Sequence, residues 1–326
     1  MLAEQTRDEV FEAELRAQLE LVETALLQSA EAQTPMVTEA AQHIIAAGGK
    51  RFRPLLVALS ARLVPGASEA DVIKAAVVVE LTHVASLYHD DVMDEARIRR
   101  GSVSANSRWG NTVAILVGDL LFARASDVVS ELGTDFVRIQ ARTFSRLVQG
   151  QIAETVGPGA GQDPLDHYLQ VVADKTAALI ATSAIFGAMI ADADPVLLQR
   201  MADFGEQLGM VFQLSDDIID ITSDVTGKTP GTDLREGIPT LPILLARRST
   251  DPADARLLQL LDSDLRDDDA LAEALDLLRR HPAVDQARAE VERRATIARL
   301  LLADLPPGPA RRALEELCES VVTRSS

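Results

Sequence analysis

Two clusters of aspartate in this chain share one spacing, D-D-x-x-D. The clusters consist of Asp90, Asp91 and Asp94, and of Asp216, Asp217 and Asp220. On a helix, residues four apart share a face, so the first and last aspartates of each cluster point the same way. The two pairs can reach metal ions in one space if their helices face each other. Oxygen-only ligands favour Mg²⁺, which completes its shell with water and substrate phosphate.

Basic residues stand close to these carboxylates. The chain has 28 Arg but only four Lys, which are Lys50, Lys74, Lys175 and Lys228. All but Lys74 lie beside a glycine-rich turn or in a context that looks like an anion site, and Arg97, Arg99 and Arg100 directly follow the first cluster. Ammonium groups suit phosphate oxygens, and guanidinium groups add bidentate contacts. This mixture favours binding of a diphosphate through Mg²⁺; the alternative is ordinary surface ion pairs on an acidic protein.

The elements that position these residues are predicted to be helices. Aromatic residues make up only 3% of the chain, and apolar residues recur at i, i+3, i+4 and i+7 in nearly every segment between glycine and proline breaks. Residues 72–90 and 205–220 are apolar around most of the helix circumference, which is typical of buried helices. Both end in clustered aspartates, whose desolvation must be offset by cations. We therefore expect an all-α protein.

Composition limits the class of protein further. Length, the absence of a repeat and an even composition favour one domain over residues 1–326. The net charge of −18 argues against a nucleic-acid or anionic-membrane binder. A single cysteine, Cys318, excludes a disulfide framework or a thiolate zinc cluster within one chain and suits a reducing cytoplasm. We find neither a secretory signal nor 18 uninterrupted apolar residues, so we expect a cytoplasmic protein with at most peripheral membrane contact.

Five blocks of sequence resemble the trans-isoprenyl diphosphate synthases. The first aspartate motif, with Glu80 to His83 before it and Arg99-Arg100-Gly101 after it, is similar to that family's first aspartate-rich motif. The other blocks are Gly49-Lys50-Arg51-Phe52-Arg53-Pro54, Lys175-Thr176-Ala177, Phe212 to Asp220, and Gly227-Lys228 with Asp233. The resemblance implies the all-α isoprenoid synthase fold around a deep cavity, usually in a homodimer. It also implies head-to-tail condensation of isopentenyl diphosphate with an allylic diphosphate.

The resemblance also implies roles for individual residues. Those implied to bind the Mg²⁺ ions that hold the allylic diphosphate are Asp90, Asp91, Asp94, Asp216, Asp217 and Asp220. Those implied to neutralise the same diphosphate are Arg99, Lys175 and Lys228. Those implied to hold isopentenyl diphosphate are Lys50, Arg53, His83 and Arg100. Thr176 and Gln213 would lie beside the developing allylic cation, at the start of a kinked helix, and with Lys175 form the predicted catalytic group.

One position departs from the family pattern. After Asp233 the family often reads R-x-G-K-x-T, whereas this chain reads Arg235-Glu236-Gly237-Ile238-Pro239-Thr240. A basic contact to the allylic diphosphate is therefore absent, which we expect to weaken binding without abolishing ionisation.

The residues before the first motif bear on product length. Ser86 and Ala85, four and five residues before Asp90, lie one turn along the helix that the growing chain is expected to follow. Short-chain members commonly carry a bulky aromatic residue there, and bacterial farnesyl synthases usually insert two residues in the motif. This chain has neither feature, which favours a long-chain polyprenyl product for quinone side chains. A farnesyl or geranylgeranyl product, a terpene cyclase and a requirement for a second subunit remain alternatives.

Overall fold

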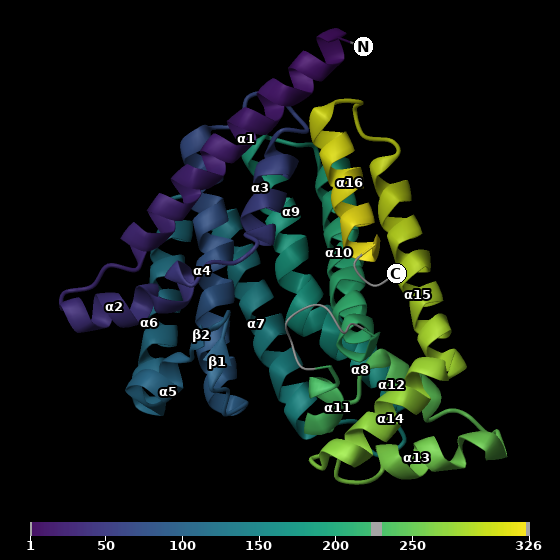
Figure 1. Cartoon of the computed structure of the whole chain (residues 1–326). Coiled ribbons are helices and arrows are strands. Elements are labelled where there is room, and N and C mark those ends of the chain that lie inside the picture. Colours follow the sequence, from purple (N-terminus) through teal and green to yellow (C-terminus); the bar gives the residue numbers. More distant parts are fainter. Residues whose placement is uncertain (1, 223–229, 324–326) are drawn as a thin grey trace. The chain divides into compact units, whose positions relative to one another are not determined.

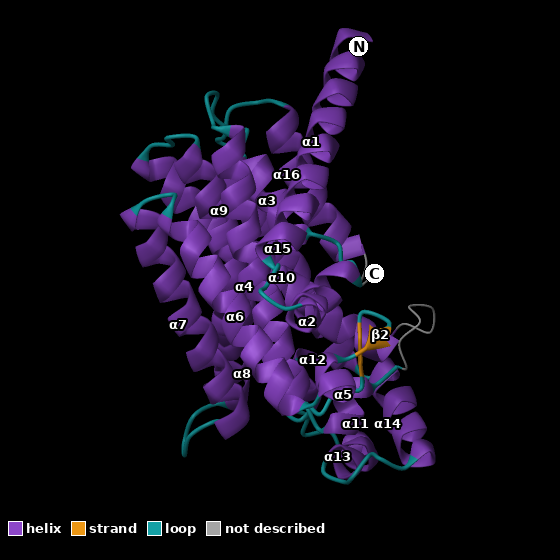
Figure 2. Ribbon diagram, turned by 90° about the vertical axis from the view of Figure 1, so that its left-hand side faces the viewer, coloured by secondary structure: helices purple, strands orange, loops and turns teal. Residues whose placement is uncertain are grey.

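The computed structural model describes residues 2–222 and 230–323, which are almost entirely helical, as predicted (Figure 1). Among these residues the strands are one short antiparallel hairpin, β1 (Ile98–Arg99) and β2 (Ser102–Val103), drawn in orange in Figure 2. Its two-residue turn has positive φ at both Arg100 (51°) and Gly101 (77°), as two-residue hairpins of this twist require. This hairpin follows the first aspartate cluster and was not predicted.

The chain divides into two compact units. The first comprises Met1–Ser145, Leu179–Ala202 and Leu305–Leu314, and the second Arg146–Ala178, Asp203–Asp304 and Glu315–Ser326. Each unit combines segments that are far apart in the sequence, so no single cut of the chain separates them. The prediction of one domain over residues 1–326 stays a prediction.

The first unit is built around α4. Its elements are α1 (Leu2–Ser29), α2 (Pro35–Ala46), α3 (Phe52–Ala61), α4 (Glu69–Met93), the hairpin, α5 (Ala105–Trp109), α6 (Asn111–Ser130), the first part of α7 (Thr134–Val156), α9 (Ala178–Ile190) and the start of α10 (Pro195–Thr222). The side chain of Ser68 accepts a hydrogen bond from the amide of Asp71 and caps α4. Buried residues occupy most of the circumference of α4, as predicted. α6 packs along it without interference because Gly118 leaves room for His89.

The second unit holds the other aspartate cluster. Its elements are the rest of α7, α8 (Pro164–Val172), a π-helical turn (Ala173–Ala177), the rest of α10, α11 (Thr232–Glu236), α12 (Leu241–Ala246), a 3₁₀ turn (Pro252–Asp254), α13 (Ala255–Leu261), α14 (Asp268–Arg280), α15 (Pro282–Leu302) and the end of α16 (Pro309–Thr323). A core of leucine, isoleucine and alanine from α10 to α15 includes Ile221, Leu234 and Leu278. This core fixes the end of α10 that carries the aspartates.

One helical run among the described residues is long and apolar enough to cross a membrane by length and composition. It extends from Pro164 to Ile190 through the π-helical turn, and 72% of its most apolar window is buried inside the protein. Burial of this extent is typical of a core helix in a folded protein.

Candidate active site

The first aspartate cluster ends α4. Asp94 is the C-terminal cap residue, and its amide donates to the carbonyl of Asp90 over 2.8 Å, so the helical turn continues and both residues share one face. Asp94 is exposed and Asp90 half-buried. The carboxylate of Asp91 is fully buried instead and accepts from Arg99 Nε over 2.6 Å. Burial raises the pKa of Asp91, although Arg99 opposes the shift. The role of Asp91 in Mg²⁺ binding stays a prediction.

The β-hairpin places two predicted arginines. Arg99 lies on β1 and reaches Asp91. Arg100, in the turn, donates from Nη1 to the carbonyls of Gly48 and of Ile44, the latter over 3.1 Å. A Cβ at Gly49 would lie 3.0 Å from Arg100 Cζ, so the glycine makes room for this guanidinium. The segment between α2 and α3 is thereby joined to the first aspartate motif.

Cations outnumber carboxylates around Glu80. Arg51 donates from Nη1 to Glu80 over 3.1 Å, and Arg100 Nη2 lies 3.7 Å from the same buried carboxylate. Burial lowers the pKa of Arg53 to about 10, and its buried Nε has no hydrogen-bond partner in residues 2–222 and 230–323. Burial and then Arg53 and Arg100 hold the pKa of His83 well below its usual range. This cationic cluster consists of Arg51, Arg53, Arg99 and Arg100, with the neutral imidazole of His83 beside them, and is therefore suited to bind an anion.

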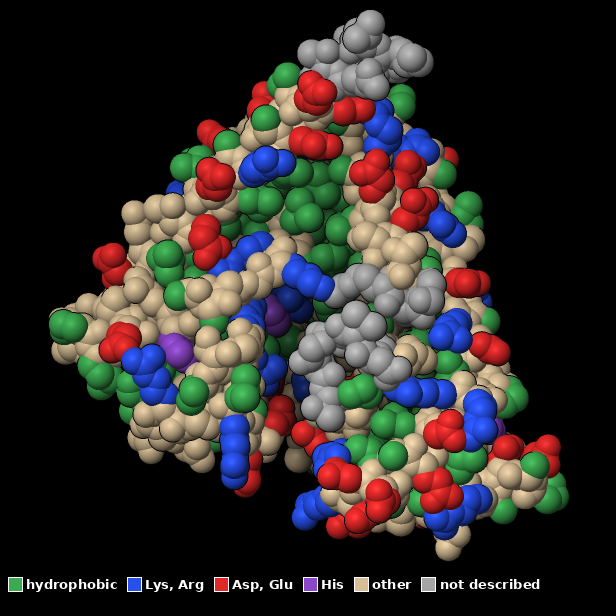
Figure 3. All heavy atoms as spheres, viewed as in Figure 1, with side chains coloured by type: hydrophobic (Ala, Val, Ile, Leu, Met, Phe, Trp, Pro, Cys, Tyr) green, Lys and Arg blue, Asp and Glu red, His purple; other side chains and the backbone are tan. Residues whose placement is uncertain are grey.

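The surface shows the same concentration of charge. Figure 3 shows Lys and Arg side chains gathered over the segment that joins α2 and α3, with a His side chain among them. Lys50 is exposed in that segment. The structure thus brings together Arg53, His83 and Arg100, three of the four residues predicted to hold isopentenyl diphosphate, and Lys50 lies three residues before Arg53 in the same unit.

The second aspartate cluster lies on the last turns of α10. Asp217 is buried, and its carboxylate accepts from the Tyr168 hydroxyl, from Gln213 Nε2 over 3.1 Å and from the amide of Leu241 over 3.3 Å. Burial raises its pKa to about 6. The carboxylate of Asp220 accepts from the amides of Thr232 and Asp233, each over 3.2 Å, and so fixes the start of α11. Asp216 is half-buried.

The predicted catalytic group surrounds a small pocket in the second unit. The pocket, of about 140 Å³, is lined by residues that include Lys175, Thr176, Gln213, Asp217 and Ile238. Thr176 Oγ1 donates to Gln213 Oε1 over 3.2 Å. Lys175 pairs with Glu154, which lines the pocket as well. A π-helical turn, Ala173–Ala177, lies where the kink was expected, and the kink itself stays a prediction. Lys228 lies outside the described residues.

Comparison with known proteins decides the family. The model of the polyprenyl synthetase family matches residues 34–278. The chain belongs to the polyprenyl synthetase family. It is 46% identical over 319 residues to nonaprenyl diphosphate synthase of Mycobacterium tuberculosis, which covers 97% of this chain and 95% of that protein.

Solved structures agree with this assignment. A geranylgeranyl pyrophosphate synthase from Corynebacterium glutamicum, complexed with calcium and isoprenyl diphosphate, has a TM-score of 0.88 and 44% identity, over 97% of this chain and 98% of that one. A decaprenyl diphosphate synthase from Rhodobacter capsulatus has a TM-score of 0.89 and 32% identity, over 98% and 99%. The predicted family and the all-α isoprenoid synthase fold are confirmed, and the synthase is a prenyltransferase that uses a divalent metal.

The aspartates of this synthase fit a metal ion whose coordination shell is completed by water and substrate. No group of three or more His, Cys, Asp or Glu side chains able to hold an ion occurs among the described residues. The pair Asp90 and Asp94 offers only carboxylate oxygens at a partly exposed helix end. Mg²⁺ typically takes one or two carboxylates and completes its shell with water and substrate phosphates. The donor set therefore fits Mg²⁺.

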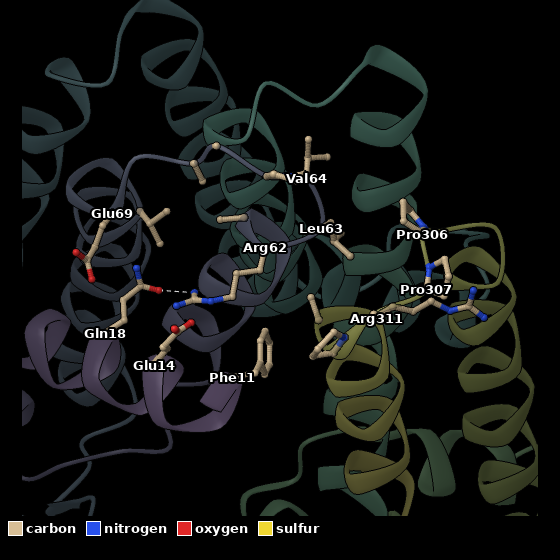
Figure 4. A pocket seen from close by; sticks show the side chains of 18 of the residues that line it. Phe11, Glu14, Gln18, Arg62, Leu63, Val64, Glu69, Pro306, Pro307 and Arg311 are labelled. Atoms are coloured by element: carbon tan, nitrogen blue, oxygen red, sulfur yellow. Dashed lines mark hydrogen bonds between the residues drawn. The ribbon is translucent and has the colours of Figure 1, made fainter. Parts of the chain in front are cut away.

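A larger pocket lies elsewhere in the first unit. It has a volume of about 680 Å³ and lies between α1, the segment after α3 and the proline-rich segment before α16. Figure 4 shows Phe11, Arg62 and Arg311 beside this pocket, and Arg62 donates a hydrogen bond to Gln18. None of the predicted site residues lines this pocket, so it has no place in the proposed chemistry.

The sequence analysis did not predict the contacts of three residues of the synthase, Arg51, Tyr168 and Glu154. Arg51 was quoted only within its motif, yet it has a positive φ of 46° and binds Glu23 and Glu80. Tyr168 and Glu154 were not noticed at all, although they hold Asp217 and Lys175. Their distance in the sequence from both aspartate motifs left no local signal; the rare tyrosines, of which the chain has two, offered the one available hint.

Proposed function

We propose that this synthase condenses isopentenyl diphosphate with an allylic diphosphate, head to tail and in trans, to give a long-chain polyprenyl diphosphate. The observation that carries this proposal is the cationic cluster around Glu80. An enzyme that ionises one diphosphate and cyclises it, as a terpene cyclase does, has no use for this second set of cations. The cluster therefore favours a two-substrate reaction.

Each aspartate motif contributes to metal binding in this proposal. Asp90, Asp94 and Asp216 would hold Mg²⁺, with Asp91, Asp217 and Asp220 beside them. Bound Mg²⁺ would supply charge stabilisation for the diphosphate leaving group. Asp91 orients Arg99, and Asp220 fixes the amides at the start of α11. Lys175 and Arg99 would add positive charge to the same diphosphate, together with Lys228.

The pocket of the second unit would stabilise the developing allylic cation. The hydroxyl of Thr176 donates a hydrogen bond to Gln213. The lone pairs of Thr176 Oγ1 are therefore available to face positive charge. Asp217 holds the Gln213 amide through Nε2, so that Oε1 is the group presented to Thr176. In the reaction the C–O bond of the allylic diphosphate breaks, the double bond of isopentenyl diphosphate attacks the cation, and a proton is lost to the released pyrophosphate.

Residues of α4 support a long product. Ala85 is fully buried and Ser86 is half-buried, with its hydroxyl donating to the carbonyl of His83 over 2.8 Å. Neither side chain is large enough to close a path along α4. The nonaprenyl and decaprenyl synthases among the relatives favour the same conclusion, whereas the geranylgeranyl pyrophosphate synthase of Corynebacterium glutamicum represents the shorter alternative. We further propose that the product supplies quinone side chains and that the enzyme works in the cytoplasm.

A homodimer is part of the proposal. In the first unit, Ile115, Leu116, Val137 and Phe144 are exposed on α6 and α7. The two helices are joined by the rings of Phe122 and Phe144, whose centroids lie 4.4 Å apart. Exposed large apolar side chains on neighbouring helices are typical of protein interfaces, and a second copy of this chain is the partner we propose.

Product analysis tests the proposed function. The purified chain is incubated with Mg²⁺, isopentenyl diphosphate and, in parallel, geranyl, farnesyl or geranylgeranyl diphosphate, with a chelator control. We expect long products that disappear on chelation, and shorter ones from Ser86→Phe, which places a ring one turn from Asp90. A C15 or C20 product from the wild type would overturn the long-chain proposal while keeping the enzyme class.

A further inference from the structure

The buried side-chain amide of Gln140 packs against α4 at Thr82, before the first aspartate cluster. Gln140, on α7, is only 8% exposed, and its Nε2 donates to Thr82 Oγ1 on α4 over 2.5 Å. The Thr82 hydroxyl in turn donates to the carbonyl of Val78 over 2.8 Å. Gln140 Oε1 is buried and has no hydrogen-bond partner among the described residues. A buried carbonyl oxygen without a hydrogen-bond partner lowers the free energy of unfolding. Folding stability alone therefore does not explain why Gln140 occupies this position.

The position of Thr82 places this amide on the expected route of the product. Thr82, Ser86 and Asp90 follow one another at intervals of four residues, so they lie on one side of α4, one turn apart. At a rise of about 1.5 Å per residue, Thr82 is about 12 Å along the helix from Asp90. A prenyl chain that grows along this side of α4 reaches the Gln140 side chain after two turns.

We propose that Gln140 and Thr82 form a polar bar which the growing prenyl chain must displace, so that elongation slows when the chain reaches it. This inference rests on the proposed function. The bar consists of one hydrogen bond between side chains, and within the part of the chain that the structure describes no second hydrogen bond anchors Gln140 Oε1. Rotation of one amide therefore opens the route, whereas an aromatic ring at the same level would close it. Gln140 is thus a specificity-determining residue that governs the distribution of chain lengths.

The test is a time course of product lengths. Wild type, Gln140→Ala and Thr82→Val are incubated with Mg²⁺, farnesyl diphosphate and excess isopentenyl diphosphate, and products are separated by length at partial conversion. We expect the wild type to accumulate one short intermediate. Both variants should lower its share about two- to tenfold, the factor that corresponds to one lost hydrogen bond. Thr82→Val keeps the volume of the side chain, so it decides the matter if Gln140→Ala does not fold.

Thr143→Val is the matched control. It removes the buried hydrogen bond between Thr143 and Thr182, 2.6 Å long, one turn further along α7. We expect it to leave the share of the intermediate unchanged. An intermediate that persists in both folded variants, or is equally lost in Thr143→Val, would overturn the bar. Absence of condensation by the wild type would instead overturn the proposed function, so the two failures are distinguishable.

Discussion

At the scale of residues, the second aspartate of each motif is committed to protein partners. Asp91 pairs with Arg99, and Asp217 accepts from Tyr168 and Gln213. Both side chains are buried, while Asp90 and Asp216 remain partly exposed. The same sequence spacing therefore yields two environments: a partly exposed first aspartate, which we propose faces the metal, and a buried second aspartate, which orients the side chains around it.

His83 makes stability depend on pH. Its pKa is lowered in the folded protein, so its contribution to stability is complete above the unfolded pKa of about 6.5 and is lost as pH falls below it. Between pH 7.5 and 5.5 we expect a loss of up to about 1.4 kcal/mol from this group. Denaturant unfolding of wild type and His83→Gln at both pH values measures the difference. An equal pH dependence in the two proteins would contradict the assignment.

Ile238 weakens binding of the allylic diphosphate in our account. It lines the pocket that contains Lys175 and is 37% exposed. Ile238→Lys should lower KM for the allylic diphosphate about three- to tenfold, because a charge-assisted contact is added, with kcat little changed. Ile238→Gln is the uncharged control. A KM that does not move in the lysine variant would show that this side chain does not reach the substrate.

At the scale of elements, the π-helical turn is seated between two glycines. A Cβ at Gly150, on α7, would lie 2.8 Å from the Lys175 amide nitrogen, and one at Gly209, on α10, 2.5 Å from Ala177 Cα. Arg146 adds a bridge between Asp174, in the turn, and Glu206 on α10. The turn that presents Lys175 and Thr176 is therefore fixed by close backbone contact on both sides.

Gly209→Ala should displace this turn. The added methyl group meets backbone rather than a flexible side chain, so we expect a destabilisation of about 1–3 kcal/mol and a fall in kcat larger than any change in KM. Thermal unfolding and steady-state kinetics measure both effects. Gly308→Ala, where nothing lies within 4 Å, is the control and should change neither. Full activity of Gly209→Ala would contradict a positioning role for the turn.

Helical periodicity predicted the long helices but not the two irregular elements of the site. The apolar circumference before Asp90 was enough to predict a buried α4, because 13 buried residues in a helix of 25 leave a clear pattern. The β-hairpin depends on a positive φ at Arg100, and residues other than glycine rarely adopt a positive φ. The π-helical turn has ordinary helix-forming residues, so only the family resemblance indicated a kink. Both elements depend on contacts with distant segments, which local patterns do not contain.

At the scale of the whole molecule, the exposed apolar side chains of α6 and α7 predict self-association. Leu116 is 61% exposed on α6. Leu116→Glu should place a charge in the interface and convert the dimer to a monomer at micromolar concentration, which light scattering after size exclusion measures. Val196→Glu, at a position 69% exposed on α10, is the control and should remain dimeric. A dimer that survives Leu116→Glu would place the interface on another face.

The sequence predicted which residues form the site better than it predicted the partners of those residues. The motifs named His83, Arg53 and Arg100 from the sequence alone, and the structure brings these three together. Glu80, the carboxylate that interacts with Arg100 and Arg53, was seen only as part of a motif, because the sequence does not distinguish a buried counter-ion from a surface glutamate. Lys228 lies outside the described residues, so its role rests on the sequence.

The central claim is that this chain alone carries out Mg²⁺-dependent condensation. Incorporation of labelled isopentenyl diphosphate into extractable product tests it most directly, with purified wild type and Asp90→Asn, with farnesyl diphosphate as the starter, with and without Mg²⁺. We predict incorporation by the wild type that requires Mg²⁺ and falls about 10²- to 10³-fold in Asp90→Asn, the scale seen when one stabilising group of this kind is removed. No incorporation by the wild type, or equal incorporation by Asp90→Asn, would contradict the account.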